Sequence, residues 1–313
     1  MKRFFSIVLM LTALIALTGC GDSLSRKEYT IATGSKSGVY YSVGEALDKI
    51  IKTKYPDVTI KVIETDGSVD NIQMLKDSKV DLALIQNDIA CYANTGSAMF
   101  EGNKFEGLSG IATLFPEVVQ FIVRRDSYIS KFSDLAGKKI AVGGKNSGTR
   151  YNVDQILGAA GVLDKVTCIY IDTKDAMTAL EAGEIDGFVF TSGFPNPSII
   201  ELSKKVEIDL VSIDMDLTQK LVNDYAFYFP NTVDQKQYTG SAAELNVLEI
   251  SAILVSGPTL SDNDQYILTK ALFGRPEELG QYHTRLNKIT KARLRQQLPI
   301  KVGAGAEKAF TEE

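Results

Sequence analysis

The chain has 313 residues, 44% of them hydrophobic and 23% charged, which is enough for two ordinary domains with a core each. Its formal net charge is −5, and no basic stripe interleaved with aromatic residues occurs. This charge argues against a nucleic-acid or anionic-membrane surface, so we expect no nucleic-acid partner.

The N-terminus predicts an export signal followed by a lipid anchor. A basic start precedes the mostly apolar stretch 4–17, which is shorter than the about 20 apolar residues that a spanning helix needs. The following Leu17-Thr18-Gly19-Cys20 resembles the lipobox of bacterial lipoproteins. That likeness implies that residues 1–19 are a lipoprotein signal peptide, that Cys20 is lipidated, and that 20–28 form a polar tether outside the cell membrane. A plain secreted protein is the alternative.

Strand and helix patterns alternate through the first part of the mature chain. Apolar runs predict strands at 29–33, 58–63 and 80–85. Apolar residues at helical spacing predict one helix over 39–51 and a second around 72–76, which Ser68 would cap. This alternation indicates a parallel sheet covered by helices.

The second part of the chain repeats this make-up after a different stretch. Extended runs at 111–114 and 117–123 are separated by Pro116, a predicted crossing point. Strands are then predicted at 139–142, 166–170, 187–190, 208–212 and 247–255, and helices at 147–160, 173–182 and from Pro197. The tail is predicted to be helical over 262–273 and 279–298, and the chain near 225–230 to be irregular.

Two Gly/Ser loops follow predicted strands, where ligands bind in open parallel sheets. Residues 37–43 and 147–153 both read S-G-x-x-Y-x-V and open a predicted helix. Backbone N–H groups at a helix N-terminus lack partners and carry partial positive charge. Two such ends suit an anion held between two lobes, although two independent helix caps are the alternative. The pairing of the loops favours binding.

Catalytic motifs are missing from these loops. Lys36 and Lys145 precede the serine, so neither loop matches the phosphate-binding pattern G-x-x-x-x-G-K-[ST]. The stretch 34–38 has lysine at its centre and is no G-x-S-x-G elbow. The single histidine, His283, lies in the tail, where we expect a structural role. The sequence therefore predicts a protein that is not an enzyme and needs no cofactor or metal. Chemistry by carboxylates alone, at a metal or on a glycoside, is the alternative that the 39 acidic residues leave open.

Two cysteines remain in the mature chain after Cys20. Cys91 and Cys168 belong to no C-x-x-C pair and to no metal-ligand spacing, and they fall in different predicted lobes. We expect both to be free, buried thiols that pack as small hydrophobic groups.

Several segments in order resemble one family of transport receptors. They are 31–47, 66–88 and 135–157, with weaker matches at 183–195, 266–273 and 298–310. On these segments the chain is similar to the TAXI (TRAP-associated extracytoplasmic immunogenic) receptors, which serve tripartite ATP-independent periplasmic (TRAP) transporters. The resemblance covers nearly all of the mature chain.

The resemblance implies an α/β, two-lobed periplasmic-binding-protein fold of type II, with a hinge and a ligand cleft between lobes. Lobe I would comprise 29–118 plus 235–313, and lobe II 119–234. The protein would be a monomer that closes on a small carboxylate or amino acid, such as glutamate, glutamine or a 2-oxoglutarate-like compound, and delivers it to a TRAP permease driven by an ion gradient. A solute-sensing lipoprotein with a signalling partner, or an exported enzyme on the same fold, are the alternatives.

The family's loop residues carry over to both lobes. The implied ligand-binding residues are Gly34, Ser35, Ser37, Gly38, Tyr40, Gln86 and Asn87 in lobe I, and Ser147, Gly148, Thr149, Ser192 and Gly193 in lobe II. Lys36 and Arg150 depart from the family pattern. Either could pair with an acidic group of the ligand or point to solvent. Asn87 could instead cap the helix that follows it.

Overall fold

The computed structural model describes residues 23–240 and 243–312. The predicted signal peptide and the predicted lipidation site Cys20 lie outside these ranges. Within them, no helix is both long and apolar enough to cross a membrane.

Ten strands of the described chain form one continuous sheet. They are β1 (Glu28–Ala32), β2 (Thr59–Ile63), β3 (Leu82–Gln86), β4 (Ser109–Arg124), β5 (Lys139–Ala141), β6 (Thr167–Ile169), β7 (Gly187–Ser192), β8 (Ile208–Leu210), β9 (Phe229–Asp234) and β10 (Glu244–Ser256). The order is β2-β1-β3-β10-β4-β7-β5-β6, with β8 beside β4 and β9 beside β10. The outer strands pair in parallel, whereas β10 and β4 pair antiparallel with each other and with their neighbours.

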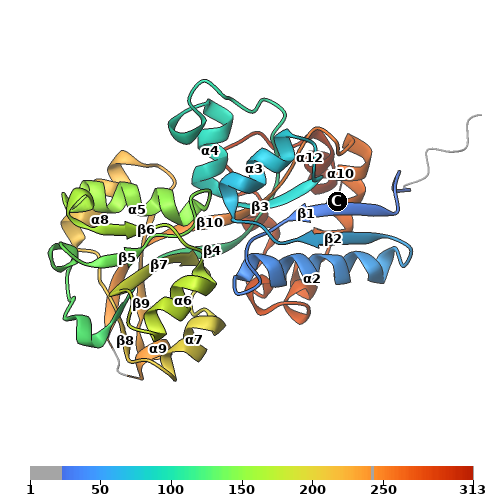
Figure 1. The fold of residues 1–313 in the computed structure, drawn as a ribbon. Helices are drawn as coiled ribbons and strands as arrows, with labels where there is room; N and C mark the ends of the chain where they lie inside the picture. The colour runs from blue at the N-terminus through green and yellow to red at the C-terminus, as the bar shows by residue number, and fades with distance from the viewer. Residues whose placement is uncertain (1–22, 241–242, 313) are drawn as a thin grey trace, which may run out of the picture.

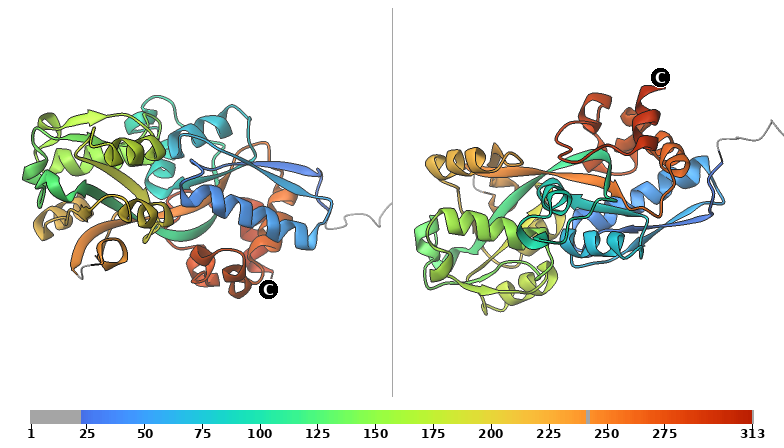
Figure 2. Two further views of the ribbon diagram at one scale, coloured as in Figure 1. Left: turned by 60° about the horizontal axis from the view of Figure 1, so that its bottom comes forward. Right: turned by 90° about the horizontal axis from the view of Figure 1, so that it is seen from above.

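Helices cover both faces of this sheet. They are α2 (Val39–Lys54), α3 (Ser68–Lys76), α4 (Asn87–Thr95), α5 (Gly148–Ala159), α6 (Thr173–Glu181), α7 (Pro197–Ser203), α8 (Met215–Asp224), α9 (Lys236–Thr239), α10 (Asp262–Phe273), α11 (Lys291–Leu294) and α12 (Ala304–Thr311). Alternate residues of β10 face opposite sides. Leu254 belongs to a core cluster with residues of α2 and α10, while Ile253 belongs to one with residues of α3 and α4. In the right-hand view of Figure 2, the orange-red C-terminal helices and the cyan helices α3 and α4 lie on opposite sides of the sheet.

The described chain is built as two lobes, as predicted, and β4 and β10 run through both of them (Figure 1). The core of the first lobe is drawn from residues 29–115 and 252–310, and that of the second from 118–250. We predicted that lobe I resumes at residue 235. Because Tyr238 and Leu248 pack in second-lobe clusters, we propose that the return crossing lies closer to Ser251.

The crossing strand corrects one prediction. Two extended runs separated by Pro116 were expected, but β4 continues through this proline as a single strand. Pro116 lies opposite Ser251 of β10, and the register between the strands shifts just beyond, between Ala252 and Ile253. An irregular position of this kind is where a strand accommodates the missing N–H of proline.

The predicted long helix in the tail was wrong, because local capping interactions interrupt it. The predicted helix 279–298 is instead two 3-10 turns, Pro276–Gln281 and η6 (Thr284–Leu286), followed by α11. His283 caps η6 by accepting a hydrogen bond from the backbone N–H of Arg285 at 3.1 Å. Caps of this kind stop a helix from propagating. The helices α8 and α12 were not predicted.

The predicted cap of α3 was also wrong. Ser68 is the first residue of the helix, and Gly67 occupies the cap position with φ +117°. Instead of capping, the Ser68 hydroxyl accepts a hydrogen bond from the backbone N–H of Gln86 at 3.1 Å. Cys91 and Cys168 are free thiols, as predicted, but both are only half-buried.

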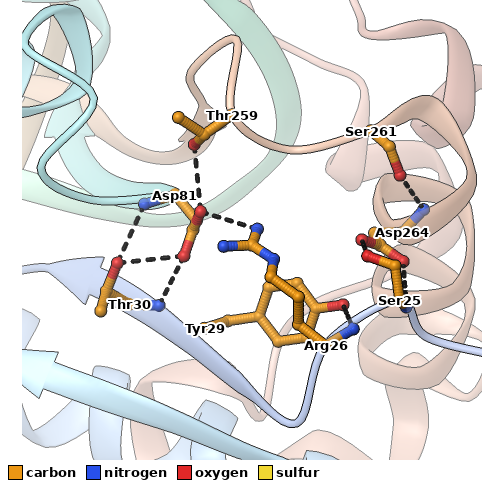
Figure 3. Close-up of polar contacts among 8 residues, drawn as sticks. All are labelled: Ser25, Arg26, Tyr29, Thr30, Asp81, Thr259, Ser261 and Asp264. Carbon is orange, nitrogen blue, oxygen red and sulfur yellow. Dashed lines mark hydrogen bonds and ion pairs between the residues drawn. The ribbon is translucent and has the colours of Figure 1, made fainter.

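The N-terminal segment is fastened to the first lobe by the buried carboxylate of Asp81 (Figure 3). It accepts hydrogen bonds from the backbone N–H of Thr30 at 2.9 Å, the guanidinium of Arg26 at 2.8 Å and the hydroxyl of Thr259 at 3.0 Å. The carboxylate of Asp81 therefore links three segments that are distant in sequence, around Arg26–Thr30, Asp81 and Thr259.

A second carboxylate holds the residue before this cluster. The backbone N–H of Ser25 donates to Asp264 at 2.8 Å, and its hydroxyl contacts the same side chain (Figure 3). The prediction that residues 20–28 form a tether is therefore wrong for 25–28, because Ser25 and Arg26 are bonded to the lobe and β1 starts at Glu28.

We expect Asp81→Ala to lower the free energy of unfolding by about 3 kcal/mol, since it leaves a buried N–H and a hydroxyl unpaired. Urea unfolding measures this difference. The control is Asp57→Ala, which removes an exposed pair with Lys27 at 3.8 Å and should cost no more than about 0.5 kcal/mol. Equal losses in both variants would contradict the assigned role of Asp81.

Candidate functional site

A cleft of about 270 Å³ lies between the two lobes. Its lining includes residues of both lobes: Gly34, Ser35, Gly38, Val39, Tyr40, Glu64, Thr65, Asp66, Gly67, Ser68, Gln86, Glu117, Gly143, Gly144, Ser147, Gly148, Thr149, Asp172, Thr173, Phe190, Thr191 and Ser192. A pocket of this size takes a small solute.

Four helices begin at this cleft. The first residues of α2, α3, α5 and α6, namely Val39, Ser68, Gly148 and Thr173, all line it. The sequence predicted two of these helix ends from the repeated Gly/Ser loop. It missed α3 and α6 as contributors because their caps, Gly67 and Asp172, share no motif with the loops. Some first-turn N–H groups already have protein acceptors: those of Val69 and Asp70 donate to the carbonyl of Asn146, and that of Arg150 to Ser147. The partial positive charge of four helix starts, together with the first-turn N–H groups that remain, favours an anion in the cleft.

Most of the predicted ligand-binding residues line the cleft. They are Gly34, Ser35, Gly38, Tyr40, Gln86, Ser147, Gly148, Thr149 and Ser192. The hydroxyl of Ser147 is already engaged, because it accepts from the N–H of Arg150 at 3.2 Å and donates to the carbonyl of Gly144 at 2.8 Å. The hydroxyl of Thr149 accepts from the N–H of Thr191 at 3.1 Å and donates to no residue of 23–240 or 243–312, so its own proton is available to a ligand.

The other three predicted residues do not line the cleft. Ser37 hydrogen-bonds Ser35, and its carbonyl accepts from Ser198 of the second lobe at 2.9 Å. Asn87 accepts from the backbone N–H of Asp88 and of Ser251. Gly193 packs against the guanidinium of Arg285. Each of them supports the walls of the site or the contact between lobes.

Neither candidate cation lines the cleft. The ammonium of Lys36 lies 3.6 Å from the carboxylate of Glu64, and its side chain is two-thirds exposed. Arg150 pairs with Asp154 on the outer face of α5 and donates to the hydroxyl of Tyr170 at 3.3 Å. Lys36 is therefore paired with a carboxylate that lines the cleft, and Arg150 with partners that do not line it.

The charged groups that line the cleft are all acidic, among the described residues. Glu64, Asp66 and Asp172 are exposed, whereas Glu117 is buried. Sequence reasoning missed Glu117 because it lies in an apolar strand pattern with no motif around it. The one sequence feature that could have pointed to Glu117 is its position next to Pro116, the predicted crossing point between the lobes.

Glu117 is held by a hydrogen bond from α2, and two charged groups from other elements act on its pKa. The hydroxyl of Tyr40 donates to its Oε2 at 2.6 Å. Burial raises the pKa of Glu117 to about 8, and the negative charge of Asp88 adds to this, while the Tyr40 hydrogen bond and Arg285 act in the opposite direction. Burial likewise raises the pKa of Asp88 to about 7. At neutral pH the carboxyl of Glu117 is therefore mostly protonated.

Direct contacts hold the lobes together around the cleft. Asn152 of α5 donates to the carboxylate of Asp88 at 2.7 Å, and the N–H of Val69 donates to the carbonyl of Asn146 at 3.1 Å. On the opposite side, Arg285 donates to the carbonyl of Phe194 at 2.5 Å. The described arrangement is therefore a closed one.

Two lobes that share two crossing strands and enclose a small polar cleft define a solute-binding protein. Residues 31–313 match the NMT1-like family, which corresponds to the TAXI solute-binding proteins, and the chain belongs to this family. The predicted family and its type II binding-protein fold are thus confirmed. The protein is an extracytoplasmic solute-binding protein of a transporter.

Solved structures of other binding proteins share the fold. The alkanesulfonate-binding protein SsuA from Xanthomonas axonopodis pv. citri, bound to MOPS, is 16% identical with a TM-score of 0.54, over 92% of this chain and 84% of that one. A putative L-cystine ABC transporter protein from Listeria monocytogenes is 16% identical with a TM-score of 0.53, over 84% and 97%. The P235GK mutant of ArgBP from T. maritima is 14% identical with a TM-score of 0.51, over 84% and 95%.

The raised pKa of Glu117 predicts a pH-dependent stability. The folded state keeps this proton up to about pH 8, whereas the ordinary value is 4.5, so wild-type stability falls as pH rises through this window. Glu117→Gln removes the effect. We expect the variant to gain about 3–5 kcal/mol relative to wild type between pH 4.5 and 8. Urea unfolding at both ends of the window measures it, and a constant difference would contradict the assignment.

Proposed function

We propose that this protein is the receptor of a TAXI-type TRAP transporter and captures a small carboxylate by closure of its lobes. It then delivers the ligand to a permease that an ion gradient drives. A lipid on Cys20 would keep the receptor at the outer face of the cell membrane. Glutamate, glutamine and 2-oxoglutarate-like compounds are the candidate ligands.

The observation that carries this proposal is the convergence of four helix N-termini on one cleft between the lobes. They can hold a carboxylate with backbone N–H groups, and the hydroxyl of Thr149 can donate to it as well. The second feature is the absence of Lys, Arg and His among the described residues that line the cleft. Helix N-termini and hydroxyl groups would therefore neutralise and hydrogen-bond the carboxylate, a role that lysine or arginine has in other anion sites.

Closure follows from the placement of these donors. α2 and α3 belong to the first lobe, and α5 and α6 to the second, so a ligand completes its hydrogen bonds only when the lobes approach. A ligand shifts the equilibrium between open and closed states only by its higher affinity for one of them. The strands β4 and β10, which cross between the lobes, provide the hinge.

Ligand screening by thermal unfolding tests the proposal. We expect at least one compound among the amino acids and the mono- and dicarboxylates to raise the melting temperature of the mature chain, because a ligand of the folded state stabilises it by mass action. Sugars, nucleosides and cationic amines without a carboxylate serve as controls. A shift with these alone, or with none of the acids, would contradict the proposed function.

Gly148 gives a specific test of closure. A Cβ at this position would overlap Oε1 of Gln86, and the three heavy atoms nearest to it all belong to this side chain of the other lobe. We expect Gly148→Ala to weaken binding of the best acid at least about tenfold, which corresponds to about 1.4 kcal/mol. Calorimetry measures the affinity, and small-angle scattering should show a more open molecule.

The matched control is Gly144→Ala, in the same cleft. A Cβ there has nothing within 4 Å, so affinity should stay within about twofold of wild type. If both alanines weaken binding equally, or if neither does, closure over Gly148 is not part of ligand capture.

A further inference from the structure

We propose that Arg285 is a positioning residue for closure of the lobes, because its guanidinium binds two main-chain carbonyls of the opposite lobe. These contacts, which we call the Arg285 clamp, join Arg285 to the carbonyls of Phe194 and Pro195. The inference rests on the proposed function, since closure around a solute is the movement that the clamp would favour. It gives the protein itself, and not only the solute, a share in holding the closed state.

The guanidinium reaches from the first lobe to the second. Arg285 belongs to η6, whose Leu286 is part of the first-lobe core cluster with residues of α2 and α10. Its Nη1 donates to the carbonyl of Phe194 at 2.5 Å, and its Nη2 contacts the carbonyl of Pro195. Both hydrogen bonds that this guanidinium makes within the described residues therefore join the lobes. Hydrogen bonds from a charged donor are stronger than those between neutral groups.

The first lobe holds Arg285 in place through the single histidine. The backbone N–H of Arg285 donates to Nδ1 of His283 at 3.1 Å. Burial lowers the pKa of His283, and the positive charge of Arg285 lowers it further, so the ring is neutral at pH 7. Because Nδ1 accepts, the ring proton lies on Nε2, which donates to the hydroxyl of Ser42 at 3.1 Å. This ties η6 to α2, the helix whose first residue, Val39, lines the cleft.

The second lobe presents the two carbonyls on a fixed segment between β7 and α7. The side-chain amide of Asn196 donates to the hydroxyl of Ser192 at 3.0 Å, and its backbone N–H donates to the hydroxyl of Tyr238 at 2.7 Å. The same asparagine caps α7. Because Ser192 lines the cleft, one segment carries both a wall of the site and the acceptors of the clamp.

Gly193 leaves the room that the guanidinium occupies. A Cβ at this position would lie 2.8 Å from Nε and 3.0 Å from Cζ of Arg285. The φ of Gly193 is not positive, so the backbone there does not require glycine. We infer that the missing side chain serves the passage of Arg285. The residue that the sequence placed in the ligand site thus belongs to the contact between the lobes.

A second hydrogen bond joins the lobes at the same edge. The hydroxyl of Ser198, in α7, donates to the carbonyl of Ser37, directly before the cap of α2, at 2.9 Å. Separation of the lobes at this edge breaks this bond together with the Arg285 clamp. Since water replaces the lost partners in an open molecule, the net contribution of each bond is smaller than its strength in the closed state.

The test measures the ratio of closed to open molecules by electron-electron distance measurements between two spin labels. The labels are placed by Lys61→Cys in β2 of the first lobe and Lys174→Cys in α6 of the second, both at exposed positions, after Cys91→Ser and Cys168→Ser have removed the described thiols. This chain is measured alone, with glutamate and with glutamine. The separation between the labels reports closure directly, which a merely structural role of Arg285 would leave unchanged.

We expect Arg285→Ala to lower the closed-to-open ratio at least about tenfold, because two charge-assisted hydrogen bonds are lost. Arg285→Lys should lower it about threefold, since lysine keeps the charge without the planar fork that reaches both carbonyls. The matched control is Arg275→Ala, an exposed arginine of the same lobe that pairs with Glu278 at 3.0 Å. It should change the ratio less than about 1.5-fold.

A double-mutant cycle shows whether Gly193 and Arg285 act through one contact. Gly193→Ala should lower the ratio at least about threefold in the otherwise unchanged chain, because the added Cβ displaces the guanidinium. In the Arg285→Ala chain the same substitution should change it less than about 1.5-fold. Effects that simply add would overturn the assigned contact.

The outcomes separate this inference from the proposed function. If the chain with intact Arg285 closes and the Arg285 variants close to the same extent, the clamp is refuted and the proposed function stands. If that chain shows only the open separation under all three conditions, closure itself is contradicted and both proposals fail. Arg285→Lys and Gly193→Ala keep the test decisive if Arg285→Ala does not fold.

Discussion

The antiparallel pairing of β4 with β10 is the constraint on which the rest of the molecule depends. The two strands stay paired from Ser109 opposite Ser256 to Val118 opposite Glu249, with two shifts of register between, and so pass together from one lobe into the other. One end of the β4–β10 pair belongs to the sheet of the first lobe, and the other end to that of the second lobe. The lobes therefore cannot separate unless this pair of strands bends. The pairing therefore fixes the floor of the cleft and leaves its sides free to move.

This geometry distributes charge within the cleft. Parallel strands on both sides end toward it, so the helices that follow point their N-termini inward. The floor, by contrast, comes from the crossing strand β4, which supplies the buried Glu117. One part of the site is thus electropositive through its backbone and the other is acidic through a side chain. A site of this polarity discriminates between ligands by where their charges lie.

Much of the fold could be predicted because local patterns and tertiary packing agree. The strands and helices of the two α/β blocks show clear periodicity, and the repeated Ser-Gly loop places α2 and α5 at the cleft. The tail helix over 262–273 was predicted correctly as α10, but the stretch after it was not, because caps at His283 and Thr290 break a pattern that suggests one long helix. The sequence left the roles of Lys36 and Arg150 open, and only the structure shows that neither lines the cavity and that they pair with Glu64 and Asp154.

The sequence by itself determined the family, the two-block α/β architecture and the two Gly/Ser loops, because each of these depends on patterns of residues that are close together in the chain. Only the tertiary structure decided what faces the ligand cavity. Glu117 and Gln86 line the same cleft from strands on either side of β10, and α3 and α6 join the site through caps that share no motif. Such a juxtaposition depends on strand order and register, which set side chains distant in sequence against one cavity.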